Sequence, residues 1–193
     1  MSNNTPAAAN ARSLSPRAIA VYCASAADLE PAILDAGIRL GAGIARAGHA
    51  MVYGGTDCGL MKITADACRE AGGKVIGVIP TFMVEKGLLA KGPNQTVTVD
   101  DMARRKSVMA EHAGAFVIMP GGLGTLDELF DILVLRQLKI HDKPIVLISI
   151  DAFFEPLVAM IDASIARKTI RPEYRKLFTV VPTPEEALKF LVG

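Results

Sequence analysis

The chain has 193 residues, of which 51% are hydrophobic, and its formal net charge at pH 7 is +1. A chain of this length and composition suits one domain with a single buried core. Because lysine and arginine balance aspartate and glutamate and form no long runs, neither a nucleic-acid nor a membrane partner is expected, and a small ligand is favoured.

The first sixteen residues, MSNNTPAAANARSLSP, are small and polar and lack the apolar stretch of a signal peptide. We interpret residues 1–16 as a disordered N-terminal tail and residues 17–193 as the folded domain. No apolar run approaches the roughly 20 residues that cross a bilayer. The odd number of cysteines, Cys23, Cys58 and Cys68, without C-x-x-C spacing, favours buried free thiols in the cytoplasm.

Short apolar runs then alternate with longer helical stretches. The predicted strands are 18–22, 49–53, 74–79, 96–99, 115–119, 144–150 and 178–181. The predicted helices are 31–47, 60–71, 101–113, 125–138, 154–167 and 184–191. The clearest strands are apolar at consecutive positions, which is typical of parallel strands covered on both faces. The pattern therefore predicts an α/β fold, with one open, mainly parallel sheet and helices on both faces.

One long irregular stretch, residues 81–95, interrupts this alternation. Two interpretations remain open for it. It is either a mobile flap over a site or an ordinary surface loop.

Three loops rich in glycine or serine follow predicted strands. They are C-A-S (23–25), G-G-T-D-C-G-L-M (54–61) and P-G-G-L-G-T (120–125). Ligands of open parallel sheets bind at the carboxyl ends of the strands, where such loops converge. In the third loop, a glycine turn before a helix leaves free N–H groups and the positive end of the helix dipole, which favour a phosphate. Neither G-x-x-x-x-G-K-[ST] nor a complete G-x-G-x-x-G is present, so the loop is not a P-loop or a dinucleotide fingerprint.

Glu128 has two interpretations. Thr125 to Glu128 reads T-x-x-E, the capping box in which both side chains bond the helix's own amides. If a phosphate occupies those amides instead, Glu128 is free to turn toward the ligand, facing sugar hydroxyls or an attacking water.

Arg105 is a candidate inward-facing charge. Met102 and Met109 define the inner stripe of its helix, and at 100° per residue Arg105 falls between them while Arg104 points away. A buried guanidinium needs a carboxylate or an anion beside it. The alternative is an arginine that snorkels on a solvated face.

At these residues the chain resembles the LOG family of cytokinin-activating phosphoribohydrolases, often mislabelled lysine decarboxylases. The resemblance is carried by M-x-x-R-K (102–106) with P-G-G-x-G-T-x-x-E (120–128), and by V-Y-G-G-x-x-x-G-L-M (52–61), V-I-G-V-I-P (75–80) and Q-L-x-I-H-D-K-P (137–144). It implies a Rossmann-like fold, usually dimeric, that hydrolyses the N-glycosidic bond of a purine nucleoside 5′-monophosphate without a metal or redox cofactor. A non-catalytic nucleotide or cofactor carrier on the same fold is the main alternative.

The resemblance also implies roles for individual residues. Arg105 and Glu128 would be the catalytic pair. The residues implied in substrate binding are Ser25, Gly54, Gly55, Gly59, Met61, Lys106, Gly121, Gly122, Gly124 and Thr125. The three histidines, His49, His112 and His141, have no ligand-like spacing, so no metal site is expected.

Four departures from the family pattern affect the shape of the pocket more than the catalytic pair. They are Ala24 in place of glycine, Thr56-Asp57-Cys58 in place of smaller residues, Lys62 in place of glycine and Leu135 in place of an aromatic residue. They make AMP a more secure expectation than a prenylated adenine nucleotide.

The helix predicted at 125–138 is apolar around more of its circumference than one core face requires. It therefore predicts a homodimer formed through this helix. The alternative is a monomer in which the helix is buried on two sides.

Overall fold

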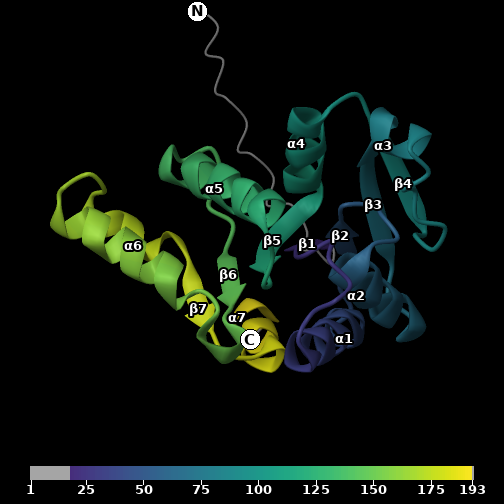
Figure 1. The fold of residues 1–193 in the computed structure, drawn as a ribbon, viewed down its shortest axis with the longest axis horizontal. Coiled ribbons are helices and arrows are strands. Elements are labelled where there is room, and N and C mark those ends of the chain that lie inside the picture. Colours follow the sequence, from purple (N-terminus) through teal and green to yellow (C-terminus); the bar gives the residue numbers. More distant parts are fainter. Residues whose placement is uncertain (1–17, 193) are drawn as a thin grey trace, which may run out of the picture.

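Seven parallel strands form one sheet in residues 18–192, the part of the chain that the computed structural model describes (Figure 1). The strands are β1 (Ala18–Tyr22), β2 (Met51–Tyr53), β3 (Val75–Pro80), β4 (Gln95–Val99), β5 (Ala113–Ile118), β6 (Ile145–Ile148) and β7 (Thr179–Val181). Their order is β4-β3-β2-β1-β5-β6-β7, and every neighbouring pair is parallel. The strand order reverses between β1 and β5, so the crevice at their carboxyl ends is the expected ligand position.

Helices cover both faces of this sheet, as the sequence predicts. One face carries α1 (Pro31–Arg46), α2 (Gly59–Glu70) and α7 (Pro184–Val192), which lie together at the bottom of Figure 1. The other face carries α4 (Met102–His112), α5 (Leu123–Gln137) and α6 (Glu155–Ala166). The short helix α3 (Thr81–Glu85) and the 3₁₀ turns η1 (Ile150–Ala152) and η2 (Pro172–Leu177) complete the helical elements. The predicted α/β fold with a parallel sheet is confirmed.

Strand β1 shows why its residues are apolar without alternation. Ile19 and Val21 pack into the core under α1 and α2. Ala20 and Tyr22 pack into the core under α4 and α5. Because both faces are buried, a polar residue at any of these positions would be desolvated.

Some predicted boundaries are wrong. Residues 81–95 are not irregular throughout, since 81–85 form α3 and β4 begins at residue 95. Helix α5 begins at Leu123, two residues before the predicted start. The predicted tail at residues 1–16 lies outside the described residues. None of the helices in residues 18–192 has the length and apolar character needed to cross a bilayer.

Candidate active site

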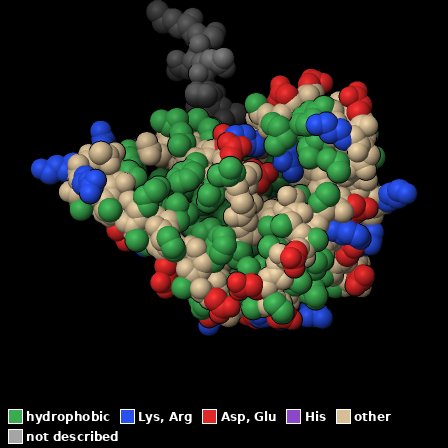
Figure 2. Space-filling view, in the orientation of Figure 1, with side chains coloured by type: hydrophobic (Ala, Val, Ile, Leu, Met, Phe, Trp, Pro, Cys, Tyr) green, Lys and Arg blue, Asp and Glu red, His purple; other side chains and the backbone are tan. Residues whose placement is uncertain are grey.

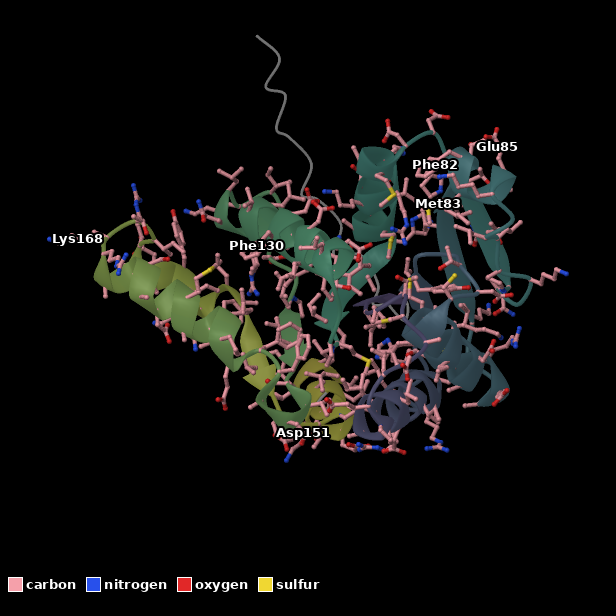
Figure 3. The ribbon with its side chains drawn as sticks, in the orientation of Figure 1. Phe82, Met83, Glu85, Phe130, Asp151 and Lys168 are labelled. Carbon is pink, nitrogen blue, oxygen red and sulfur yellow. The ribbon has the colours of Figure 1, made fainter. Side chains whose placement is uncertain are left out.

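A cleft of about 220 Å³ opens where α3, α4 and the start of α5 meet the end of β1. Its walls are formed by Cys23, Ser25, Met61, Met83, Arg105, Gly122, Leu123, Gly124, Thr125 and Glu128. Met83 comes from α3, which lies beside α4 in Figure 3. The cleft is therefore at the crevice between β1 and β5 that the strand order predicts.

The N-terminus of α5 forms one wall of the cleft. Its N-cap is Gly122, which has no side chain to cap the helix, and the first intrahelical bond runs from the Leu126 amide to the Gly122 carbonyl at 3.1 Å. The amides of Leu123, Gly124 and Thr125 come before this first intrahelical donor, so they have no acceptor within the helix. Together with the helix dipole, they make this wall suitable for an anion.

The capping-box interpretation of Glu128 is wrong. Thr125 lies inside α5 and not at its N-cap, so the two side chains cannot cap the helix start. The Glu128 carboxylate instead accepts a hydrogen bond from Arg105, with 3.2 Å between Nη1 and Oε1. This contact crosses from α4 to α5.

Arg105 and Glu128 form a buried ion pair, in which only 7% and 9% of the two side chains are exposed. Arg105 Nε also donates to the Val78 carbonyl at 3.2 Å. The prediction that Arg105 faces inward is therefore confirmed, and Arg104 is exposed and pairs with Glu111. That prediction assumed that Met102 and Met109 both face the core. Met109 is buried, but Met102 is exposed.

Burial changes the protonation of Glu128. It raises the pKa of the carboxyl group from its ordinary 4.5 to about 7, although the nearby Arg105 charge acts in the opposite direction. Desolvation disfavours the ionised form more than one guanidinium favours it. Glu128 therefore exchanges its proton near neutral pH, which is typical of carboxyl groups that take part in chemistry.

Gly54 makes room for this pair. A Cβ atom at Gly54 would lie 1.8 Å from Nη2 of Arg105, so any side chain there would displace the guanidinium. Gly59 has a φ of +47°, and a Cβ there would lie 2.0 Å from the Ala26 carbonyl oxygen. These glycines support the cleft from behind and do not line it.

The glycines of the third loop divide into two kinds. A Cβ at Gly121 would lie 2.1 Å from Thr125 Oγ1, so this glycine lets Thr125 pack against the loop. A Cβ at Gly122 or Gly124 would meet no protein atom within 4 Å. Because these two residues line the cleft, their missing side chains leave open space in it and accommodate no other part of the protein.

Lys106 lies outside the cleft. Its Nζ contacts Asp127 at 3.0 Å and Asp131 at 3.4 Å, on the outer surface between α4 and α5. The predicted site residues that the structure brings together in the cleft are Ser25, Met61, Arg105, Gly122, Gly124, Thr125 and Glu128. Those that do not line it are Gly54, Gly55, Gly59, Lys106 and Gly121. The role of each toward a substrate stays a prediction.

Three residues that line the cleft were missed from the sequence: Cys23, Met83 and Leu123. Cys23 and Leu123 belong to two of the loops that were expected to converge at the ligand position, but neither residue was named as part of the site. Leu123 stands between the loop glycines and is 87% exposed, which is unusual for a leucine. Met83 could not have been found, because the helix that carries it lies in a segment interpreted as irregular.

The cleft has no residue suited to a pyridoxal cofactor, since no lysine is among the residues that line it. Within residues 18–192, no three or more His, Cys, Asp or Glu side chains are grouped so that they could hold a metal ion. The chemical groups in the cleft are the helix amides, the buried ion pair, the Ser25 and Thr125 hydroxyls, the Cys23 thiol and apolar side chains.

Known proteins resemble this chain over most of its length. The family described as "Possible lysine decarboxylase" matches residues 61–191. The probable cytokinin riboside 5′-monophosphate phosphoribohydrolase LOGL2 of Oryza sativa subsp. japonica is 36% identical over 91% of this chain and 72% of its own. The cytokinin riboside 5′-monophosphate phosphoribohydrolase LOG3 of Arabidopsis thaliana is 35% identical over 91% of this chain and 81% of its own.

Solved structures share the fold at lower identity. The molybdenum cofactor binding protein of Rippkaea orientalis has a TM-score of 0.70 and 20% identity, covering 92% of this chain and 96% of its own. The molybdenum cofactor carrier protein of Chlamydomonas reinhardtii has a TM-score of 0.69 and 21% identity, covering 91% of this chain and 96% of its own. At this identity the likeness shows a common fold alone.

Proposed function

Since the chain belongs to the LOG family of phosphoribohydrolases, we propose that it hydrolyses the N-glycosidic bond of a purine nucleoside 5′-monophosphate. The products are the free base and ribose 5-phosphate. Curated relatives at about 35% identity over most of the chain are named phosphoribohydrolases, so the chain is an enzyme of the N-glycosyl hydrolase class. The observation that carries the proposal for this chain is the buried Arg105–Glu128 pair beside an uncapped helix N-terminus.

In the proposed complex, the 5′-phosphate binds at the N-terminus of α5. The amides of Leu123, Gly124 and Thr125 donate to its oxygens, and the absent side chains of Gly122 and Gly124 let it approach the backbone. Fixing the phosphate fixes the ribose, which brings its anomeric carbon to one position in the cleft. Glu128 lies on the next turn of the same helix, so phosphate and carboxylate are held by one rigid element.

Glu128 acts on the sugar in its ionised form. As the bond from C1′ to the purine nitrogen breaks, its electron pair goes to the base and positive charge develops at C1′. A carboxylate stabilises that charge, and it accepts a proton from the water whose oxygen bonds to C1′, while the departing purine nitrogen takes up a proton from solvent and leaves as the neutral base. Arg105 cannot act as the base, because its guanidinium stays protonated; it holds Glu128 in place through the 3.2 Å contact.

The apolar residues of the cleft suit the base. Met61, Met83 and Leu123 line it beside the polar pair. Purines are flat and largely apolar on their faces, and such side chains can cover them. The relatives are named for cytokinin ribosides, so we propose AMP and its cytokinin-type derivatives as the substrate class.

The test is to incubate the protein with AMP and with isopentenyladenosine monophosphate and to measure free base and ribose 5-phosphate. Glu128→Gln is expected to lower turnover by about 100- to 1,000-fold, because it removes the charge but keeps the shape. Asp127→Asn is the matched control on the same helix turn, where the carboxylate is exposed, and it is expected to keep wild-type turnover.

Other functions give different results in the same experiment. A nucleotide or cofactor carrier would bind AMP without releasing adenine. A lysine decarboxylase would release carbon dioxide from lysine and would need pyridoxal phosphate. Release of base by Glu128→Gln at the wild-type rate would contradict the proposed role of this carboxylate.

We also propose that the protein is a homodimer that associates through α5. Apolar side chains gather in the hollow between α5 and α6 (Figure 2), where an apolar groove of about 180 Å³ is lined by residues that include Phe130 and Val134. Phe130, Val134 and Leu138 are 38%, 49% and 61% exposed, and they follow one another at helical spacing. Such a face favours a self-complementary contact.

Light scattering at micromolar concentration tests the dimer. The wild type is expected at twice the mass of one chain, and Val134→Glu is expected to run as a monomer because it places a charge in an apolar contact. Arg167→Glu, on an exposed position at the end of α6, is the control for the added carboxylate. A monomeric wild type would contradict the proposal.

A further inference from the structure

Thr56 carries a buried hydroxyl group in the loop that joins β2 to α2. The residue is only 1% exposed, and its hydroxyl donates to the sulfur of Met61, with 3.8 Å between Oγ1 and Sδ. A thioether sulfur is a weak acceptor, so the bond is modest in strength. Because Thr56 is buried, however, water does not compete for its hydroxyl, and the bond can hold the Met61 side chain in one place.

Met61 is restricted from a second side by the backbone behind it. A Cβ atom at Gly54 would lie 3.1 Å from Sδ of Met61, so the sulfur lies close to the glycine backbone. The Met61 amide donates to the Ala24 carbonyl at 3.3 Å, which ties the start of α2 to the loop after β1. Methionine has three rotatable side-chain bonds and normally adapts its shape to its neighbours. The bond from Thr56 and the contact with Gly54 limit that adaptation here.

Thr56 also connects Met61 to the segment that follows α3. The backbone of Thr56 pairs with Leu89 in an isolated antiparallel bridge. Leu88, the residue before Leu89, donates its amide to the Met83 carbonyl at 3.1 Å. Met83 lies on α3 (Figure 3) and lines the cleft, as Met61 does. A short series of contacts therefore runs from Thr56 to both methionines of the cleft.

Resting on the proposed function, we infer that Thr56 is a positioning residue for substrate choice, whose hydroxyl fixes Met61 in the cleft and so favours the unsubstituted purine of AMP over a purine with an apolar group on N6. A side chain that is already fixed loses no freedom when a base of matching size binds. A larger base requires the wall to change shape, and the bond from Thr56 opposes that change. Thr56 acts through Met61 and does not itself line the cleft.

The variant Thr56→Val tests this inference, because valine replaces the hydroxyl with a methyl group of similar size. Only a weak acceptor, the Met61 sulfur, loses its partner, so the thermal midpoint should not fall. With AMP, KM is expected to rise about threefold at an unchanged kcat, as for the loss of one weak bond that orders a binding residue. KM for isopentenyladenosine monophosphate should not rise, so the preference for AMP falls.

Two further variants are the controls. Thr56→Ser keeps a hydroxyl donor for Met61, so it should keep the wild-type preference for AMP. Thr64→Val removes an equally buried hydroxyl from α2, but that hydroxyl donates to the Leu60 carbonyl at 2.9 Å and faces α1 at Gly37. It should change KM for neither substrate.

A measurement without substrate separates this inference from the proposed function. The carbon-13 shift of a methionine ε-methyl group depends on its terminal torsion, and the Met61 signal is assigned by its loss in Met61→Leu. The signal should move toward the value of a freely rotating methionine in Thr56→Val, and it should stay in Thr56→Ser and Thr64→Val.

The outcomes are distinct. An unchanged Met61 signal in Thr56→Val would overturn the inference, and so would a moved signal with an unchanged preference for AMP. If the wild type releases no base, the proposed function fails instead, and the preference is then compared through the dissociation constants of the two nucleotides.

Discussion

Two neighbouring residues of α4, Arg105 and Lys106, form ion pairs with two neighbouring residues of α5, Glu128 and Asp127. Arg105 meets Glu128 at 3.2 Å, and Lys106 meets Asp127 at 3.0 Å. The distances are nearly equal, but the surroundings are not. The carboxylate of the inner pair is 9% exposed, whereas that of the outer pair is 58% exposed.

The difference shows that burial, and not separation, decides what an ion pair does. In the inner pair, desolvation exceeds the attraction of the guanidinium and moves the Glu128 pKa to about 7. In the outer pair, the Asp127 carboxylate is 58% exposed, so solvent screens the contact and it contributes little stability. The inner pair therefore contains a carboxyl group that titrates near neutral pH at a cost in stability, while the outer pair is a largely solvated contact between the two helices.

The largest effect is expected from substitutions that break each ion pair in turn. Arg105→Met leaves the Glu128 carboxylate buried without its partner, and we expect it to lower the free energy of unfolding by about 3–5 kcal/mol. Lys106→Met is the matched control, with an expected loss below about 1 kcal/mol. Urea unfolding at pH 8 measures both. Equal losses would show that burial does not separate the pairs.

The second effect is a dependence of stability on pH. The folded pKa of Glu128 is about 7 and its ordinary value is 4.5, so the folded state binds a proton that the unfolded state has lost between these values. The free energy of unfolding should therefore fall as pH rises from 4.5 to 7, by about 3 kcal/mol in total from this group.

Glu128→Gln removes this dependence. It should match the wild type near pH 4.5 and be more stable than the wild type at pH 8, while turnover is lost. Asp127→Asn controls for a new amide on α5. Thermal unfolding of the three proteins across this pH range is the measurement, and parallel curves for wild type and Glu128→Gln would refute the raised pKa.

The smallest effect concerns the space around the inner pair. Gly54→Ala places a Cβ 1.8 Å from the Arg105 guanidinium, and we expect a stability loss of about 1–3 kcal/mol with reduced turnover. Gly124→Ala meets no atom within 4 Å, so its stability should be that of the wild type, and only AMP affinity should weaken. Calorimetry of unfolding and of AMP binding separates the two. A stability loss in Gly124→Ala would contradict this division.

Much of the fold could be predicted because each strand is a short apolar run and the helices between them have periodic apolar faces. The strand at 18–22 and the helix starts at 31 and 184 agree with the structure to the residue. The errors fall where no periodic pattern exists. The five residues of α3 are too few to show one, and η2 lies between residues 167 and 178, where no helix or strand was predicted.

The site could be predicted only in part. The buried position of Arg105 was one of two interpretations that its helix left open. The helix pattern could not identify its partner, because Glu128 lies 23 residues away; only the family resemblance named the two together. The T-x-x-E spacing even indicated a different bond for Glu128.

The empty space beside Gly122 and Gly124 predicts how these positions vary among related sequences. The fold itself would tolerate a methyl group at either position. Under the proposed function, variation at Gly122 and Gly124 is therefore limited by the bound phosphate and not by the packing of the protein. Gly54 and Gly121, in contrast, are constrained by the architecture. A family member that keeps Gly54 and Gly121 but has lost Gly122 and Gly124 would thus keep the fold and no longer bind a nucleotide in this way.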